Sequence, residues 1–350
     1  MARRRLEAAI RAGRAINEEQ NRSSGVFDSA ELVLSITQKD SDMGVYSLQF
    51  SPEGDLLAVG CGNGAVRVYN CSDGKVKSKL CEGSKSGLPI TCLVFHPRMQ
   101  KALVGAGADG RISVYNVATA HRTFTTVEPH NEINALDFSL EGDRYATAGK
   151  DFSIRLYDTE TNEMVQVYEG SQQLLPDKEE ALESGHGRRV FALKYHPDDN
   201  HVFITGGWDN CLKIWDYRTK RGVQRTIPGP HICGNGIDIK DGKILTASWQ
   251  AEKSVQIWDC ASGRLEQTID LFKRSMMGEF PYCAQFCDNN VVLAGGSGTC
   301  SVQAIDKDKN KLVVDMSLED KPVQALDSTN GGRLFALGGA STTIKMARLQ

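Results

Sequence analysis

The 350-residue sequence predicts an all-β protein assembled from repeated modules. Short apolar runs bounded by Gly, Asp, Asn and Pro recur along most of the chain, almost without helical periodicity. An aromatic or apolar residue followed by a small polar residue also returns about every 42 to 47 residues, with one longer interval. These pairs are Tyr69-Asn70, Tyr115-Asn116, Tyr157-Asp158, Trp215-Asp216, Trp258-Asp259, Ile305-Asp306 and a degenerate Ala347-Arg348. Length alone would suggest about two ordinary domains, but the period indicates one repeat array.

Each module repeats one order of strands and turns. A first strand occurs at 45–50, 90–95, 133–138, 190–195 and 323–328. A turn such as SPEGD, SLEGD or HPDDN follows, and then a second strand rich in small residues, such as LLAVG, YATAG or VFITGG. A third strand, such as AVRVY, SIRLY or LKIW, ends at the recurring pair. This order predicts one small sheet for each module.

With seven such copies, the chain resembles the WD-repeat family over residues 32–350. The resemblance implies an all-β, seven-bladed WD-repeat β-propeller. It also implies a buried hydrogen-bonded set in each complete copy. In the fourth copy the set would be His186, Thr205, Asp209 and Trp215, and the third copy retains His130, Thr147 and Asp151 with Tyr157 in the Trp place.

These sets are interpreted as braces of the fold. Each hydrogen bond contributes about 0.5 to 1.5 kcal/mol net, and a buried member left without its partner costs more. A catalytic Ser-His-Asp-like triad is disfavoured, since the trio recurs as an architectural element and no oxyanion donor is recognisable.

The two ends of the repeat array are expected to meet. The last copy offers three strands and then the chain stops, which would leave an unpaired edge. The apolar segment 31–36 stands before the first copy without a partner of its own. Pairing of 31–36 with the last blade would close the ring, so that residues 26–350 form one domain.

Residues 1–25 carry the helical pattern of the chain. Leu6, Ile10 and Ile16 form a narrow apolar stripe among arginines, so a short amphipathic helical tail is expected. Three interpretations stay open: a solvated tail, a helix that docks on another protein, and an arm for nucleic acid or membrane.

Two insertions interrupt the period. The polar and acidic segment 168–187 is expected to be a surface loop with a short helix after Pro176. The segment 271–282 carries Met276, Met277, Phe280 and Tyr282, which would be adhesive if they were exposed together.

Composition argues for a globular chain without cofactor. The net charge of −3 gives no global field for nucleic acid, and no apolar run is long enough to span a bilayer. The ten cysteines show no CxxC pair and no His partner spacing, so no metal or redox site is predicted and a reducing compartment is expected. We therefore expect no nucleic-acid, membrane or small-molecule partner.

One face of the propeller is the expected recognition surface. Trp208 and Trp249 each lie three residues after a Thr in adjacent blades, so both should project onto the face that carries the loops into the first strands. The alternative is that both rings lean on their own turns. Neighbouring loop positions hold Arg188, Arg189, Glu132, Lys150, Phe280 and Tyr282.

Three function classes follow. The first is a non-enzymatic scaffold in a larger cytoplasmic assembly, with cytoskeletal or ciliary assemblies as the specific expectation and the nucleus left open. The second is a substrate receptor of a cullin-RING ubiquitin ligase, because Trp215-Asp216-Tyr217-Arg218 matches the Trp-Asp-x-Arg box of such receptors. A G-protein-beta-like signalling adaptor is a further alternative. Nothing in the sequence supports the third class, an enzyme.

Overall fold

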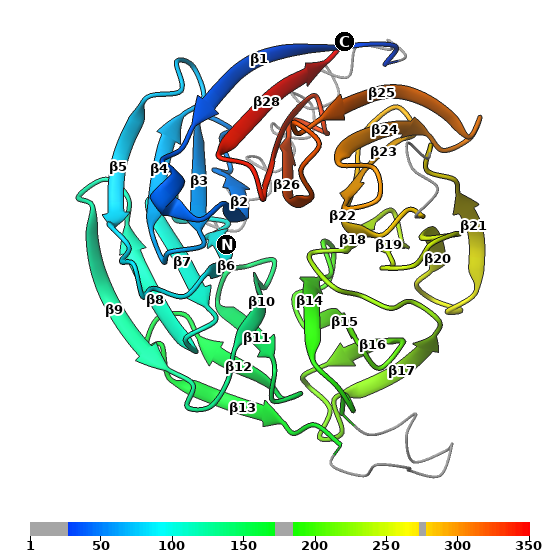
Figure 1. The fold of residues 1–350 in the computed structure, drawn as a ribbon. Coiled ribbons are helices and arrows are strands. Elements are labelled where there is room, and N and C mark those ends of the chain that lie inside the picture. Colours follow the sequence, from blue (N-terminus) through cyan, green and yellow to red (C-terminus); the bar gives the residue numbers. More distant parts are fainter. Residues whose placement is uncertain (1–26, 172–184, 273–277) are drawn as a thin grey trace, which may run out of the picture.

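The computed structural model describes residues 27–171, 185–272 and 278–350. Within them, seven four-stranded antiparallel sheets stand as blades around a common centre (Figure 1). The predicted seven-bladed β-propeller is confirmed. Apart from the strands there is one 3-10 helix, Asp40–Asp42, among the described residues.

The strands follow the chain from the centre outward in each blade. The first blade holds β2 (Val45–Phe50), β3 (Leu56–Cys61), β4 (Val66–Asn70) and β5 (Val76–Cys81). The second holds β6 (Ile90–Phe95), β7 (Ala102–Gly107), β8 (Arg111–Asn116) and β9 (His121–Val127). The third holds β10 (Ile133–Phe138), β11 (Arg144–Gly149), β12 (Ile154–Asp158) and β13 (Met164–Tyr168). The fourth holds β14 (Val190–Tyr195), β15 (Val202–Gly207), β16 (Cys211–Asp216) and β17 (Val223–Pro228).

The remaining blades continue this order until the last one. The fifth holds β18 (Ile237–Lys240), β19 (Lys243–Ala247), β20 (Val255–Asp259) and β21 (Leu265–Ile269). The sixth holds β22 (Pro281–Phe286), β23 (Val291–Gly296), β24 (Ser301–Asp306) and β25 (Lys311–Ser317). The seventh holds β26 (Val323–Thr329), β27 (Leu334–Gly339), β28 (Thr343–Leu349) and, outermost, β1 (Ala30–Thr37).

The two ends of the described chain meet in the seventh blade. Strand β1 contains the segment 31–36 and pairs antiparallel with β28, with Ile36 opposite Ile344. Beyond the strand, the Asp28 N–H donates to the Gln350 carbonyl at 2.9 Å. The outer edge of β28 is thereby covered, which removes an exposed template for aggregation.

Apolar side chains fill the spaces between neighbouring blades. One cluster joins Val45, Leu48 and Tyr69 of the first blade to Ile344 and Met346 of the seventh. Corresponding clusters join the other blades, because the central strands have both faces covered. The second strands are accordingly buried along almost their whole length.

Turn chemistry repeats between modules. In the turns SPEGD and SLEGD the first Ser hydroxyl donates to the Asp carboxylate, Ser51 to Asp55 and Ser139 to Asp143, each at 2.7 Å. Gly142 has a φ of 76°, and a Cβ there would lie 2.4 Å from the His96 ring of the neighbouring blade. Glycine therefore serves both the turn and the close approach of two blades.

Two faces can be defined from the topology. Because consecutive strands are antiparallel, their connections alternate between the two ends of a blade. The upper face carries the loops into the first strands and the turns between second and third strands. The lower face carries the other connections. The predicted tail with Leu6 and Ile10, Met276 and Met277, and most of the segment 168–187 lie outside the described residues.

Candidate functional site

The fourth blade contains a four-residue chain of hydrogen bonds. Trp215 Nε1 donates to Thr205 Oγ1 at 2.7 Å, and Thr205 Oγ1 lies 2.6 Å from His186 Nε2. His186 Nδ1 lies 2.7 Å from Asp209 Oδ2. Since an indole nitrogen only donates, the Thr205 hydroxyl is left to donate to Nε2, and Nδ1 carries the proton shared with Asp209. The order of donors is thus Trp215, Thr205, His186 and the Asp209 carboxylate.

Electrostatics fit a structural role for this chain. Burial acts to raise the pKa of Asp209, but the charge and hydrogen bond of His186 outweigh it and hold that pKa at about 2. His186 and Thr205 are fully buried. A substrate cannot reach the Thr205 hydroxyl, so the arrangement braces the loop before β14 against β15 and β16 and offers no nucleophile.

The same blade holds the one cluster of metal-ligating side chains found among the described residues. Donor atoms of His186, Asp209 and Cys211 lie within 4.8 Å of one another. Both His186 nitrogens are already engaged, and burial raises the pKa of the Cys211 thiol. The group therefore suits a hydrogen-bonded brace better than a cation, which needs a thiolate and an imidazole lone pair.

The third blade corrects the sequence prediction at one position. His130 is exposed with a φ of 63°, and Glu128 takes the inward place instead. The Glu128 carboxylate accepts from the Tyr157 hydroxyl at 2.8 Å and from Arg155 at 3.0 Å, and Thr147 also donates to it.

Asp151 binds the other end of the Arg155 guanidinium. Thr147, Asp151 and Tyr157 therefore belong to a brace built around an ion pair, with Glu128 in place of the expected His130.

Two further blades use an acidic residue from the loop before the first strand. In the first blade Asp42 forms a bidentate pair with Arg67, at 2.6 and 2.9 Å. In the seventh blade Glu319 accepts from Ser341 at 2.9 Å and Thr343 at 3.0 Å. The sequence signal for the first and third blades was an Arg as the second residue of the third strand, with an acid shortly before the first strand.

The upper face of the fourth and fifth blades carries an aromatic patch, defined here as Arg189, Phe191, Trp208, His231, Trp249 and Phe280. Trp208 and Trp249 are both 39 % exposed. His231 lies between them, its ring parallel to Trp208 at a centroid distance of 6.4 Å and its carbonyl accepting from the Trp249 N–H at 2.7 Å.

Other contacts fix the two indoles at their outer sides. Phe191 packs on Trp208 at 5.0 Å and Phe280 packs on Trp249 at 4.9 Å. The Arg189 guanidinium lies over the Trp208 ring at 5.7 Å from its centroid. Both indoles are therefore held rigidly while a large part of each remains exposed.

Charged residues border the aromatic patch on the side of the third blade. Glu132 accepts from Lys150 at 2.7 Å and from Arg189 at 2.6 Å, so one carboxylate orients two cations. Arg188 is exposed beside them. Tyr282, the second residue of β22, lies in the wall of the central cavity described below.

The sequence missed His231 and Phe191, because their contacts join loops of different blades.

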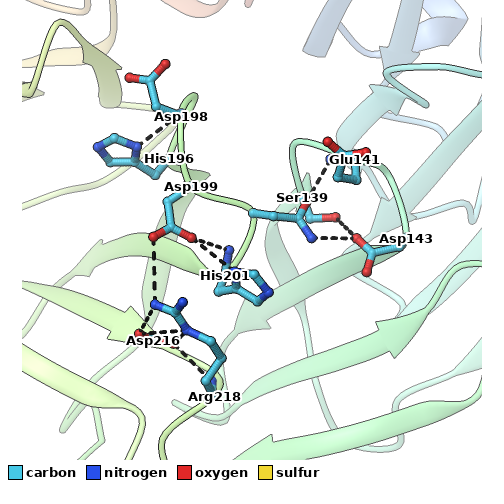
Figure 2. A network of polar contacts seen from close by, with 10 residues as sticks. Ser139, Glu141, Asp143, His196, Asp198, Asp199, His201, Asp216 and Arg218 are labelled. Carbon is cyan, nitrogen blue, oxygen red and sulfur yellow. Dashed lines mark hydrogen bonds and ion pairs between the residues drawn. The ribbon is translucent and has the colours of Figure 1, made fainter. Parts of the chain in front are cut away.

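Arg218 lies on the opposite, lower face. Figure 2 shows its guanidinium held by Asp216, with nitrogen–oxygen distances of 2.6 and 2.9 Å, and facing Asp199 at 3.7 Å. His201 also contacts Asp199, at 3.2 Å. The side chain is 53 % exposed, so Arg218 is oriented by its own turn and presented to solvent.

The lower-face network also fastens neighbouring blades. Asn200, in the turn between β14 and β15, accepts from the Glu141 N–H at 2.7 Å and donates to Asp143 at 3.0 Å. Arg98 of the second blade pairs with Glu141. The second, third and fourth blades are thus connected in series at this face. None of the described helices has the length and apolarity needed to cross a bilayer.

Comparisons with known proteins agree with this architecture. The family model for the anaphase-promoting complex subunit 4 WD40 domain matches residues 21–98, and that for the WD domain, G-beta repeat, matches residues 122–158 and 179–216. The second range of the latter contains the whole His186 brace. WD40 propellers are in general non-enzymatic interaction scaffolds, and neither matching model describes a catalytic family.

Several curated relatives share this similarity. APC/C activator protein CDH1 of Saccharomyces cerevisiae is 26 % identical over 230 residues, which cover 64 % of this chain and 36 % of that protein. WD repeat-containing protein 25 of Mus musculus is 30 % identical over 139 residues, 39 % of this chain and 23 % of that protein. WD repeat-containing protein slp1 of Schizosaccharomyces pombe is 21 % identical over 242 residues, 68 % of this chain and 45 % of that protein.

The chain spans less than half the length of each of these three relatives. What they share with it is the repeat pattern, and the seven closed blades carry the same pattern through the described residues. The chain belongs to the WD-repeat family.

Proposed function

We propose that this chain is a non-enzymatic docking scaffold that holds other proteins on the upper face of its propeller, within a larger assembly. The observation that carries the proposal is the aromatic patch, in which two exposed Trp rings are held rigid beside an Arg. Trp and Arg dominate binding hot spots, and a side chain that is already ordered loses little entropy when a partner binds.

The relatives support an assembly of several subunits. One is an APC/C activator protein, and another, 26 % identical over 172 residues, is GATOR2 complex protein WDR24 of Danio rerio. We place the assembly of this chain in the cytoplasm, with cytoskeletal or ciliary structures as the specific proposal and the nucleus as the alternative.

Affinity purification of the full chain with lysine cross-linking tests the docking face. The upper face offers exposed Lys150 and Lys253, and the lower face offers exposed Lys220 and Lys309. We expect a stoichiometric partner whose cross-links fall on Lys150 and Lys253. Cross-links confined to Lys220 and Lys309 would contradict the proposal.

Variants sharpen the same experiment. Trp208→Ala combined with Trp249→Ala should remove the partner, because hot-spot truncations cost about 2 kcal/mol or more each. Leu265→Ala, on the outer strand of the fifth blade, removes a comparably exposed apolar side chain and should retain it. Thermal unfolding of all variants separates lost binding from lost folding.

The second candidate, a cullin-RING substrate receptor, is favoured by one observation: Arg218 is exposed and oriented on the lower face. Arg218→Ala should then abolish pull-down of the cullin adaptor and leave the Trp208-dependent partner bound. The G-protein-beta-like alternative depends on residues 1–25, and deletion of that segment tests it through loss of the partner.

A further inference from the structure

The seven central strands enclose a cavity of about 310 Å³. Each central strand neighbours the central strands of the adjacent blades, as Figure 1 shows. Side chains from the second position of the strands line the cavity on the upper side: Tyr46, Thr91, Asn134, Phe191, Tyr282 and Gln324.

A ring of seven side chains lies three residues further along the same strands. Its members are Gln49, Val94, Asp137, Lys194, Asp238, Gln285 and Asp327, and the first four of them line the cavity directly. We call these residues the channel ring. It contains three carboxylates and one ammonium, so it is acidic.

Each carboxylate of the channel ring is fixed by the blade beside it or across the gap. Asp137 accepts the Tyr195 N–H at 2.8 Å, and Asp327 accepts the Phe50 N–H at 2.6 Å. Asp238 accepts the Phe286 N–H at 2.8 Å. The backbone therefore holds all three acids in place before any ligand arrives.

One lysine does not balance the three acids. Lys194 Nζ lies 3.8 Å from Asp137, and the nearby carboxylates raise the pKa of Lys194. Burial nevertheless raises the pKa of Asp137 and Asp238, and raises that of Asp327 to about 6. The ring is thus short of positive charge, and a second cation would lower the cost of its buried carboxylates.

Acceptor atoms without partners point to the same chemistry. Gln324 Oε1, on a cavity-lining residue, and Gln285 Oε1, in the channel ring, are buried without a hydrogen-bond donor among the described residues. A buried acceptor without a donor is costly, so a guest that carries several N–H donors suits this space.

The cavity adjoins the aromatic patch. Phe191 belongs to both, and the Trp208 indole N–H donates to Cys233 Sγ at 3.0 Å, whose residue also lines the cavity. A protein bound on Trp208 therefore lies beside the cavity mouth. Tyr46 and Tyr282 add aromatic faces there, and such faces attract cations.

We propose that the central cavity accepts a lysine or arginine side chain from the protein docked on the upper face. This inference rests on the proposed docking function and adds the chemistry of the residue that the partner inserts. The guest's charged head contacts the channel ring, and its stem lies between Tyr46, Phe191 and Tyr282. Lys194 competes with the guest for the same carboxylates.

Fluorescence anisotropy with two peptide pairs tests the inference on the full chain. The probes are labelled seven-residue Gly/Ser/Ala peptides with a central arginine or lysine, and their neutral counterparts carry citrulline or acetyl-lysine. We expect at least one charged peptide to bind about tenfold more tightly than its neutral counterpart, which corresponds to about 1.4 kcal/mol. Equal binding within both pairs, or no binding up to about 1 mM, would overturn the inference.

Variants of the channel ring give the sharper result. Asp137→Asn should weaken the charged peptide about tenfold, whereas Lys194→Met should strengthen it, because the competing ammonium is removed. A gain of affinity cannot result from misfolding. Asp109→Asn, at an exposed upper-face turn outside the cavity lining, is the matched control and should change nothing. Weaker binding in Lys194→Met would refute the inference.

Failure of the inference can be told from failure of the docking function. If Trp208→Ala with Trp249→Ala releases the natural partner but the channel-ring variants do not alter its affinity, the docking function stands and the inference falls. If the partner cross-links only to the lower face, the docking function falls as well.

Discussion

The third and fourth blades place a cation at the same position and treat it in opposite ways. Arg155 lies opposite Thr147, and Lys213 lies opposite Thr205. Burial acts to lower the pKa of Arg155, but Asp151 and Glu128 outweigh it and raise that pKa. For Lys213 burial prevails and lowers the pKa, although Cys211 and Asp209 act in the other direction.

The difference arises in the loop before the first strand. The third blade sends in the carboxylate Glu128, which needs a cation, and the fourth sends in the imidazole His186, which needs an acceptor and a donor. One position of the fold can thus be braced by an ion pair or by a chain of neutral donors. In the second case the cation on the third strand becomes a burden.

Glu128→Ala is expected to have the largest effect. It removes the acceptor of Tyr157 and Thr147 and leaves the largely buried Arg155 guanidinium with Asp151 as its remaining printed carboxylate. Loss of one partner of a buried ion pair costs about 3 to 5 kcal/mol. Urea denaturation at pH 7 measures the loss. Glu160→Ala, an exposed acid in the same blade, should change stability by less than about 0.5 kcal/mol.

The outcome also ranks the two braces. We expect His186→Ala to cost less than Glu128→Ala, since it leaves polar groups without partners but no cation. The reverse order would show that the ion pair is the weaker brace.

Asp209→Asn is expected to have an intermediate, pH-dependent effect. Because the pKa of Asp209 is about 2 in the folded chain against an ordinary 3.8, the carboxylate stabilises the fold fully above pH 3.8, by about 2 kcal/mol. The stabilisation is lost as pH falls toward 2. Denaturation at pH 7, 5, 4 and 3 should therefore show the wild-type advantage shrinking below about pH 4. Asp198→Asn, at an exposed lower-face turn, should show a constant, small difference.

The sequence could predict those parts of the molecule that depend on one module. The strand order, the seven blades and the register that brings Trp208 and Trp249 to one face follow from the period. The Thr205 and Trp215 positions follow from the fourth copy alone, because they pair within one sheet.

Features formed between modules could not be predicted in this way. His130 fitted the motif, but its left-handed backbone turns it outward and Glu128, two residues earlier, takes the inward position. The stacking of His231 on Trp208 joins two blades, and the channel ring joins all seven. Their neighbours are a whole module or more apart in sequence, so a pattern within one copy carries no sign of them.

Lys213→Met is expected to have the smallest effect and the opposite sign. The side chain is almost fully buried, its Nζ donates to Thr226 Oγ1 at 3.3 Å, and its lowered pKa shows that the fold disfavours the charged form. Met has similar volume and no charge to desolvate, so stability at pH 7 should stay within about 1 kcal/mol of wild type or rise. Because the fold disfavours the charged lysine, any gain should grow as pH falls below the ordinary lysine pKa of 10.5. Arg155→Met is the matched change in the third blade and should cost about 3 kcal/mol or more, because it leaves Glu128 buried without the cation. If both substitutions destabilise the chain equally, the two blades do not differ in the way their pKa shifts indicate.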